Sequence, residues 1–225
     1  MSDPAQEKTR EIRARLCLFS GLGADERVFQ FLDFSGWETT SIRWIKPEPM
    51  EPIAHYARRL LAQIPDAPSI LLGVSFGGMV AVEVAKLIAA EQVILISSAA
   101  TRQDLPIYTR LAKILNMRRC LPMRWLTIPN PLTAWLFGAQ TPAERKLLAD
   151  ILRDTDPAFL SWAIEKILNW ENTWKPENLV RLHGARDRIL PARHADFEIA
   201  GGGHFMAVNR AAEISGILRE KILPQ

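Results

Sequence analysis

A serine stands between two glycines in the segment Gly73-Val74-Ser75-Phe76-Gly77. The apolar run Ser69–Val74 precedes it and the apolar segment Gly77–Ala90 follows it, so we expect the serine where a strand turns sharply into a helix. Such a turn holds a hydroxyl above the sheet edge, and the small flanking residues let strand and helix approach each other. No Gly-Lys-Ser/Thr follows that would indicate a phosphate loop, so the segment predicts Ser75 as a nucleophile.

A serine hydroxyl is a weak nucleophile at neutral pH and needs a base. Of the four histidines, His204 follows three consecutive glycines and precedes the last helical segment. Glycines permit unusual backbone angles and close approach, which suits a histidine presented on a loop. We therefore predict His204 as the base. His55 is predicted as a surface or packing residue, His183 as a core residue in a strand, and His194 as part of a polar turn.

The base in turn needs an acceptor that fixes its tautomer. Asp187 lies just beyond an expected strand, although an Asp-Arg pair there could also form a plain surface turn. The chain order Ser75, Asp187, His204 is the order found in hydrolases of this topology, and it favours Asp187 as the partner of the base. A competing acid after the strand Gln92–Ile96 has little support, because Asp104 is the first carboxylate to follow it.

The glycine loop Ser20-Gly21-Leu22-Gly23 follows the first expected strand, Arg15–Phe19. Backbone N–H groups in such a loop can stabilise negative charge on a reacting oxygen. We predict the Leu22 N–H as one donor, and the Phe76 N–H, at the start of the helix after Ser75, as the other. A simple glycine turn is the alternative interpretation.

The remaining pattern alternates strands with helices. Strands are expected at 15–19, 39–45, 69–74, 92–96, 179–182 and 197–199, and helices at 53–64, 77–90, 107–115, 131–137, 142–153, 157–167 and 207–222. The central strands are apolar without alternation, which is typical of parallel strands covered on both faces. The predicted fold class is α/β: a mostly parallel sheet of about six strands, reduced at both edges, with helices on both faces.

Residues 101–174 depart from the alternation, since they predict several helices without a strand. We interpret them as a helical lid inserted into a core formed by 15–100 and 175–225, after a flexible N-terminus at 1–14. Apolar lid residues could line an acyl pocket or simply pack on the core. They are Leu115, Met117, Leu121, Met123, Trp125, Leu126, Trp135, Leu136 and Phe137.

Together these segments resemble the α/β-hydrolase superfamily, through the glycine loop, the GVSFGG elbow, HGARDRILP and GGGHF. The resemblance implies Ser75 as nucleophile, His204 as general base and acid, and Asp187 as its orienting partner. It also implies oxyanion donors at Leu22 and Phe76, elbow glycines at 73 and 77, and no metal or other cofactor.

Two features depart from the superfamily pattern. Many members carry His-Gly where this chain has Ser20-Gly21. The interval from Asp187 to His204 is also short, which leaves little room for the usual helix between the last two strands.

The composition excludes several classes of protein. The 225 residues are 48% hydrophobic and 24% charged, with a formal net charge of +3, which is too small to indicate nucleic-acid binding. No apolar run is long enough to span a bilayer, and no signal segment is evident. Two cysteines cannot form a disulfide framework, and Cys17 is expected to be buried. We expect a cytoplasmic protein that binds neither nucleic acid nor membrane.

The predicted function is hydrolysis of a small-molecule carboxylic ester or thioester through an acyl-enzyme. An acidic acyl carrier is a further possible partner, because basic residues gather in the first half of the lid, although a solvated helix face would look the same. These residues are Arg102, Arg110, Lys113, Arg118, Arg119 and Arg124. The alternatives are a non-catalytic small-molecule-binding protein of the same fold, and a basic surface that binds nucleic acid or membrane.

Overall fold

The computed structural model describes residues 14–114, 128 and 130–223 of the chain. Six strands form one sheet in the order β2-β1-β3-β4-β5-β6, and every neighbouring pair is parallel. The predicted fold class is therefore confirmed. The strands are β1 (Arg15–Phe19), β2 (Thr39–Ile42), β3 (Ser69–Val74), β4 (Gln92–Ile96), β5 (Leu179–Gly184) and β6 (Phe197–Ile199).

Both faces of the sheet are buried, because apolar residues occupy successive positions in its central strands. Leu16 and Leu18 of β1 belong to one hydrophobic core, whereas Cys17 and Phe19 belong to the core on the other face. Cys17 is fully buried, as predicted, and burial raises the pKa of its thiol. The absence of polar alternation in the sequence thus reflects a strand that packs on two sides.

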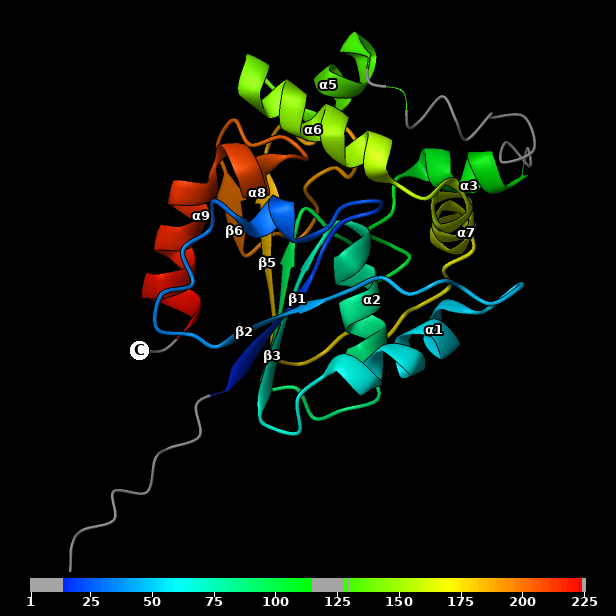
Figure 1. The fold of residues 1–225 in the computed structure, drawn as a ribbon, viewed down its shortest axis with the longest axis vertical. Coiled ribbons are helices and arrows are strands. Elements are labelled where there is room, and N and C mark those ends of the chain that lie inside the picture. Colours follow the sequence, from blue (N-terminus) through cyan, green and yellow to red (C-terminus); the bar gives the residue numbers. More distant parts are fainter. Residues whose placement is uncertain (1–13, 115–127, 129, 224–225) are drawn as a thin grey trace, which may run out of the picture.

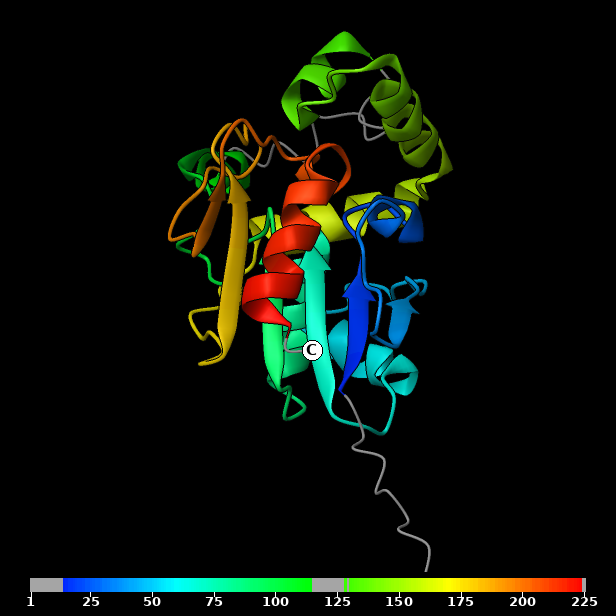
Figure 2. The same ribbon diagram turned by 90° about the vertical axis from the view of Figure 1, so that its left-hand side faces the viewer.

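Helices cover each face (Figures 1 and 2). The helix α1 (Ile53–Leu60), its 3-10 extension η2 (Leu61–Gln63) and α2 (Phe76–Ala85) lie on one side. On the other lie α8 (Met206–Asn209), α9 (Ala211–Ile217) and the π-helical turn η4 (Leu218–Ile222). The closing helix predicted at 207–222 is thus interrupted at Arg210, and the helix predicted at 77–90 ends at Ala85.

In the described part of the interval between β4 and β5, the chain forms four helices. They lie beyond the carboxyl ends of the strands (Figures 1 and 2). They are α3 (Ile107–Ile114), α5 (Pro131–Phe137), α6 (Pro142–Asp154) and α7 (Pro157–Leu168). The last three begin with proline after a side chain that caps the helix: Asn130, Thr141 and Asp156. None of the described helices is long and apolar enough to cross a membrane.

The carboxyl ends of the strands carry the predicted site residues. Parallel strands bring these ends to one edge of the sheet. A 3-10 turn, η1 (Glu26–Phe29), follows the loop after β1. All residues of 185–196, between β5 and β6, are described and form turns and bends without a helix, as the short interval predicted.

Candidate active site

Ser75 occupies the sharp turn between β3 and α2. Its backbone has φ +52° and ψ −123°, a conformation that strains any residue other than glycine. A Cβ atom at Gly73 would collide with the backbone of Gly78, and one at Gly77 would collide with the carbonyl oxygens of Phe19 and Ser20. Only glycine at these two positions therefore lets strand and helix close the turn that presents the Ser75 hydroxyl.

The structure brings Ser75, His204 and Asp187 into one chain of hydrogen bonds. His204 Nε2 lies 2.8 Å from Ser75 Oγ, and His204 Nδ1 lies 2.8 Å from Asp187 Oδ2. An ionised carboxylate only accepts hydrogen bonds, so Nδ1 donates to Asp187, and in the neutral tautomer Nε2 accepts a hydrogen bond from the Ser75 hydroxyl. This arrangement makes the serine oxygen a candidate nucleophile with a base already in contact.

Asp187 is held as an anion inside the protein. Its side chain is fully buried, and its Oδ1 accepts the backbone N–H groups of Ile189 at 2.9 Å and Leu190 at 2.8 Å. Burial alone would raise the pKa of Asp187, but the facing His204 and hydrogen bonds from His183, His204 and Leu190 lower it well below its usual range. The carboxylate is therefore fixed in the form that accepts a hydrogen bond from an imidazole.

His183 is a neighbour of the site that the sequence did not identify. It is buried in β5, as predicted for a core histidine, and its Nε2 donates to the Leu190 carbonyl at 2.6 Å. The same nitrogen lies 3.3 Å from Asp187 Oδ2. The two residues are four positions apart in the chain. This spacing carries no meaning across a strand end, so nothing in the sequence pointed to the contact.

The predicted oxyanion donors are the backbone N–H groups of Leu22 and Phe76. Leu22 and Phe76 line the same cavity as Ser75 and His204. Phe76 is the first residue of α2, so its N–H has no acceptor within the helix and is available to a ligand.

The loop that carries Leu22 is anchored through its backbone carbonyls. Ser20 stands where many superfamily members have histidine, and its hydroxyl donates to the Ala24 carbonyl at 2.7 Å. Two side chains from other segments complete the anchoring: Trp44 Nε1 donates to Gly21 O at 3.3 Å, and Thr155 Oγ1 donates to Gly23 O at 2.9 Å. The loop is thus held by partners from three parts of the chain, without the histidine.

A cavity of about 530 Å³ opens beside the serine. Its lining is mainly apolar, with side chains such as Val28, Met79, Leu105, Leu136, Phe137, Leu148, Ile151, Leu160, Ile164 and Ile167. Of the residues proposed from the sequence for an acyl pocket, Leu136 and Phe137 line it, whereas Trp135 is absent from the lining and is 55% exposed. The other six, between 115 and 126, lie outside the described residues.

Asp104 is not a competing acid. Its carboxylate is buried, accepts the backbone N–H groups of Ala100 and Thr101 at 2.9 Å, and pairs with Arg181 at 3.4 Å. Among the basic residues noted in the first half of 101–174, Arg102 pairs with Glu171. The side chains of Arg110, Lys113, Arg118, Arg119 and Arg124 lie outside the described part.

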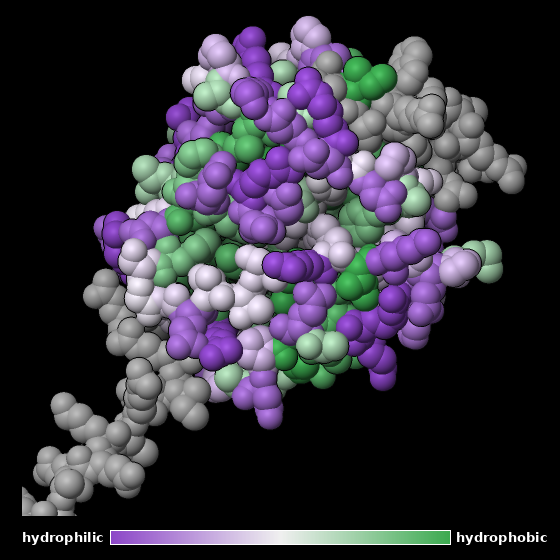
Figure 3. Space-filling model, in the orientation of Figure 1, coloured by the Kyte–Doolittle hydropathy of each residue, from purple (hydrophilic) through white to green (hydrophobic). Residues whose placement is uncertain are grey.

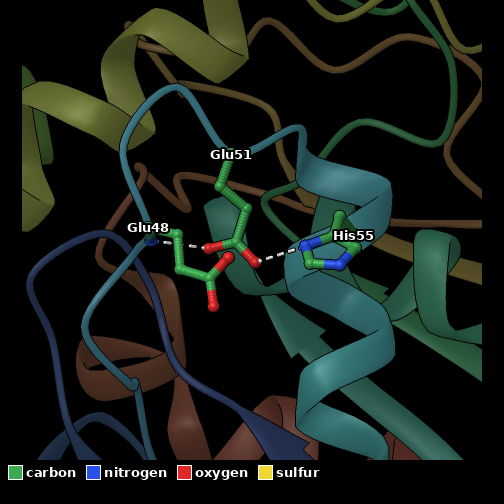
Figure 4. Close-up of side chains that lie close together, drawn as sticks. All are labelled: Glu48, Glu51 and His55. Carbon is green, nitrogen blue, oxygen red and sulfur yellow. Dashed lines mark hydrogen bonds and ion pairs between the residues drawn. The ribbon is translucent and has the colours of Figure 1, made fainter.

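Glu48, Glu51 and His55 form a second cluster, near the start of α1 (Figure 4). Their ligand atoms lie close enough together to hold a metal ion. The Glu51 carboxylate is buried, however, and accepts Arg59 Nη1 at 2.8 Å, the Glu48 N–H at 2.8 Å and His55 Nδ1 at 2.9 Å. Arg59 already supplies the positive charge, so the cluster is a structural ion pair that needs no metal.

Residues 15–216 match the model of the alpha/beta hydrolase family, and the chain belongs to this family. No curated protein sequence matches it. The resemblance inferred from the elbow and the two loops is thereby confirmed.

Solved structures share the fold at low sequence identity. An esterase from Thermogutta terrifontis has a TM-score of 0.65 at 15% identity, covering 94% of this chain and 91% of its own. The enol-lactonase from Burkholderia xenovorans LB400 has a TM-score of 0.68 at 16% identity, and the match covers 93% of this chain and 91% of the enol-lactonase. YbtT, a type II thioesterase from the yersiniabactin biosynthetic pathway, has a TM-score of 0.58 at 14% identity, and the match covers 94% of each chain.

Proposed function

We propose that this protein is a serine hydrolase that cleaves a carboxylic ester or thioester through an acyl-enzyme. The observation that carries the proposal is the continuous hydrogen-bonded chain from Ser75 through His204 to Asp187, at the wall of an apolar cavity. A hydroxyl, an imidazole and a buried carboxylate in this order are the groups that acyl transfer to water requires.

In the acylation step the Ser75 oxygen attacks the substrate carbonyl carbon while His204 Nε2 accepts the hydroxyl proton. The negative charge that develops on the carbonyl oxygen is stabilised by the N–H groups of Leu22 and Phe76. His204 then returns the proton to the leaving oxygen or sulfur as its bond to carbon breaks, and the acyl group remains on Ser75.

In the deacylation step a water molecule attacks the acyl-enzyme. His204 takes a proton from the water and gives it back to the Ser75 oxygen as the acid product departs. Asp187 stays ionised throughout, because its low pKa favours the charged form, and it stabilises the imidazolium that forms twice in the cycle.

The cavity defines the acyl part of the substrate. A volume of about 530 Å³ with an apolar lining suits a hydrocarbon or aromatic acyl group. Esters and thioesters are favoured over amides because their leaving groups depart without demanding protonation. The names of the neighbours support the same class, since they include an esterase, an enol-lactonase and a thioesterase.

The helices between β4 and β5 form the lid of this cavity in our proposal. Leu136, Phe137 and Leu148 come from α5 and α6, whereas Ile164 and Ile167 come from α7, and all five line the cavity. Substrate choice would therefore depend on residues in 101–174 rather than on the sheet.

A panel of p-nitrophenyl esters and N-acetylcysteamine thioesters, with acyl chains from acetyl to dodecanoyl, tests the proposal. We expect hydrolysis by the wild type, with kcat/KM rising with chain length until the cavity is filled. Ser75→Ala should abolish it, whereas Ser41→Ala, at an exposed serine of β2, should keep the wild-type rate. A wild-type protein that hydrolyses no member of the panel would contradict the proposal.

A further inference from the structure

A second cavity, of about 600 Å³, adjoins the one that contains Ser75. The two share four lining residues: Thr133, Leu148, Leu152 and Arg188. The second cavity extends between α5, α6 and the loops around Asp187 and His204. Its lining includes Gly203, the residue directly before His204.

The charged side chains that line this second cavity are all arginines. Arg145 comes from α6, and Arg186 and Arg188 flank Asp187 in the loop after β5. No aspartate or glutamate belongs to the described lining, and none of the three arginines forms an ion pair with a carboxylate in the described part of the chain. Three cations around one concave surface, none of them in an ion pair in the described part of the chain, create a positive potential that attracts anions.

Arg188 is held in place at the junction of the two cavities. Its Nη1 donates to the Trp135 carbonyl at 2.8 Å, and its guanidinium carbon lies 4.4 Å from the centroid of the Trp135 ring. These contacts leave other guanidinium N–H groups free, and a fixed guanidinium loses little entropy when it binds phosphate or carboxylate.

The protein surface over α5 and α6, the two helices that line the second cavity, is polar. The face over α5 and α6 that is turned to the viewer is mostly hydrophilic (Figure 3). The cavity beside Ser75 has the opposite character, since its lining is mainly apolar and would disfavour a buried anion. The two cavities therefore suit different parts of one substrate.

We propose that the arginine-lined cavity binds an anionic group, phosphate or carboxylate, on the leaving-group part of the substrate. This inference rests on the proposed function. In that mechanism His204 protonates the leaving group, and Gly203 beside it lines the second cavity, so the leaving group faces the arginines while the acyl group fills the apolar cavity. The natural substrate is then an apolar acyl ester or thioester of a phosphorylated or carboxylated alcohol or thiol.

Two matched substrate pairs test the proposal and distinguish phosphate from carboxylate. The first pair is the same acyl thioester of phosphopantetheine and of pantetheine, and the second is the same acyl ester of γ-hydroxybutyrate and of its neutral amide. The charge lies far from the scissile bond in both, so it leaves the chemistry unchanged. We expect the anionic member of one pair to have a kcat/KM at least about tenfold higher, with the preference shrinking at high salt.

Variants of the lining arginines test whether the preference for the anionic substrate arises in this cavity. Arg145→Gln and Arg186→Gln should each lower the ratio of anionic to neutral kcat/KM by about tenfold. The matched control is Arg58→Gln, an exposed arginine of α1 outside this cavity, which should leave the ratio unchanged. Melting temperatures confirm that each variant is folded.

The two failures can be told apart. Equal rates within both pairs, in an enzyme that hydrolyses the neutral members, would overturn the anion site and leave the proposed function standing. A preference that persists in Arg145→Gln and Arg186→Gln would also overturn it. Failure of the wild type to hydrolyse any of the four substrates would overturn the proposed function, and the anion site with it.

Discussion

Two clusters in this protein pair a buried carboxylate with a histidine. Asp187 contacts His204 and His183 at the carboxyl edge of the sheet, and Glu51 contacts His55 near the start of α1. Both carboxylate side chains have no exposed surface. In both cases burial opposes ionisation, and hydrogen bonds and neighbouring charge nevertheless lower the pKa of the carboxyl group.

The two clusters differ in the surroundings of the histidine. His204 is itself buried and places its second nitrogen 2.8 Å from the Ser75 hydroxyl, beside a cavity. The side chain of His55 is 53% exposed, and Arg59 already neutralises its carboxylate partner. A buried carboxylate–histidine pair is therefore not enough to define an active site; a nucleophile and a cavity must adjoin it.

The largest expected difference between the clusters is in catalysis. Asp187→Asn keeps the shape of the side chain but removes the charge that stabilises the imidazolium, so kcat should fall by about 10³–10⁴-fold. Glu51→Gln is the matched change in the other cluster and should leave kcat per folded molecule within about twofold of wild type. Initial rates on the best ester of the panel measure both. Equal losses of kcat in the two variants would contradict a catalytic role for the Asp187 cluster alone.

The Glu51 cluster should contribute to stability rather than to catalysis. Glu51→Gln removes the negative charge that faces Arg59 and replaces one of the two accepting oxygens with an NH2 group. We therefore expect a loss of about 1–3 kcal/mol in the free energy of unfolding. Urea denaturation measures it, with His55→Gln as a control that should cost less because that side chain is half exposed. Unchanged stability in Glu51→Gln would show that the ion pair contributes nothing.

The low pKa values predict an effect of acid on both clusters. Each carboxylate is easier to ionise in the folded than in the unfolded protein, so its contribution is fully present above its ordinary pKa of about 4. The contribution is lost as the pH falls below that value, because the unfolded chain then takes up protons that the folded one excludes. The free energy of unfolding between pH 7 and pH 3 should decline less steeply in Asp187→Asn and Glu51→Gln than in wild type, and parallel curves would contradict the assignment.

The smallest expected effect concerns the loop Ser20-Gly21-Leu22-Gly23, which carries the predicted oxyanion donor Leu22. Ser20→Ala removes the hydrogen bond to the Ala24 carbonyl, and the loop that carries the Leu22 N–H becomes less well fixed. We expect kcat to fall by about tenfold with KM little changed, since a poorly placed donor weakens only the transition state. Ser41→Ala serves as the control. A change in KM alone would assign Ser20 to substrate binding.

The sequence predicted the features that depend on local chemistry. The strands β3 and β4 have their predicted bounds, because continuous apolar runs between turn residues leave few alternatives. The glycines around Ser75 marked the elbow, and the short interval after Asp187 predicted that no helix would form there.

Contacts that depend on how loops fold back and meet could not be predicted from the sequence. His183 was predicted to be buried, but its contact with Asp187 depends on how the loop after β5 folds back. The hydrogen bond from Thr155 to Gly23 joins residues far apart in the chain, and no local pattern marks either as a partner of the other. The predicted closing helix breaks at Arg210, where φ is −126° and ψ is 22°, although no proline or glycine in the sequence marks this position.

The central claim is that Ser75 is a nucleophile activated by His204. Reaction with a fluorophosphonate probe, followed by intact-mass measurement and peptide mapping, tests it most directly. We expect one adduct, on Ser75, with labelling much slower in His204→Gln and unchanged in His55→Gln. An unmodified protein, or an adduct on another serine, would contradict the account and favour a protein of this fold that binds a small molecule without turning it over.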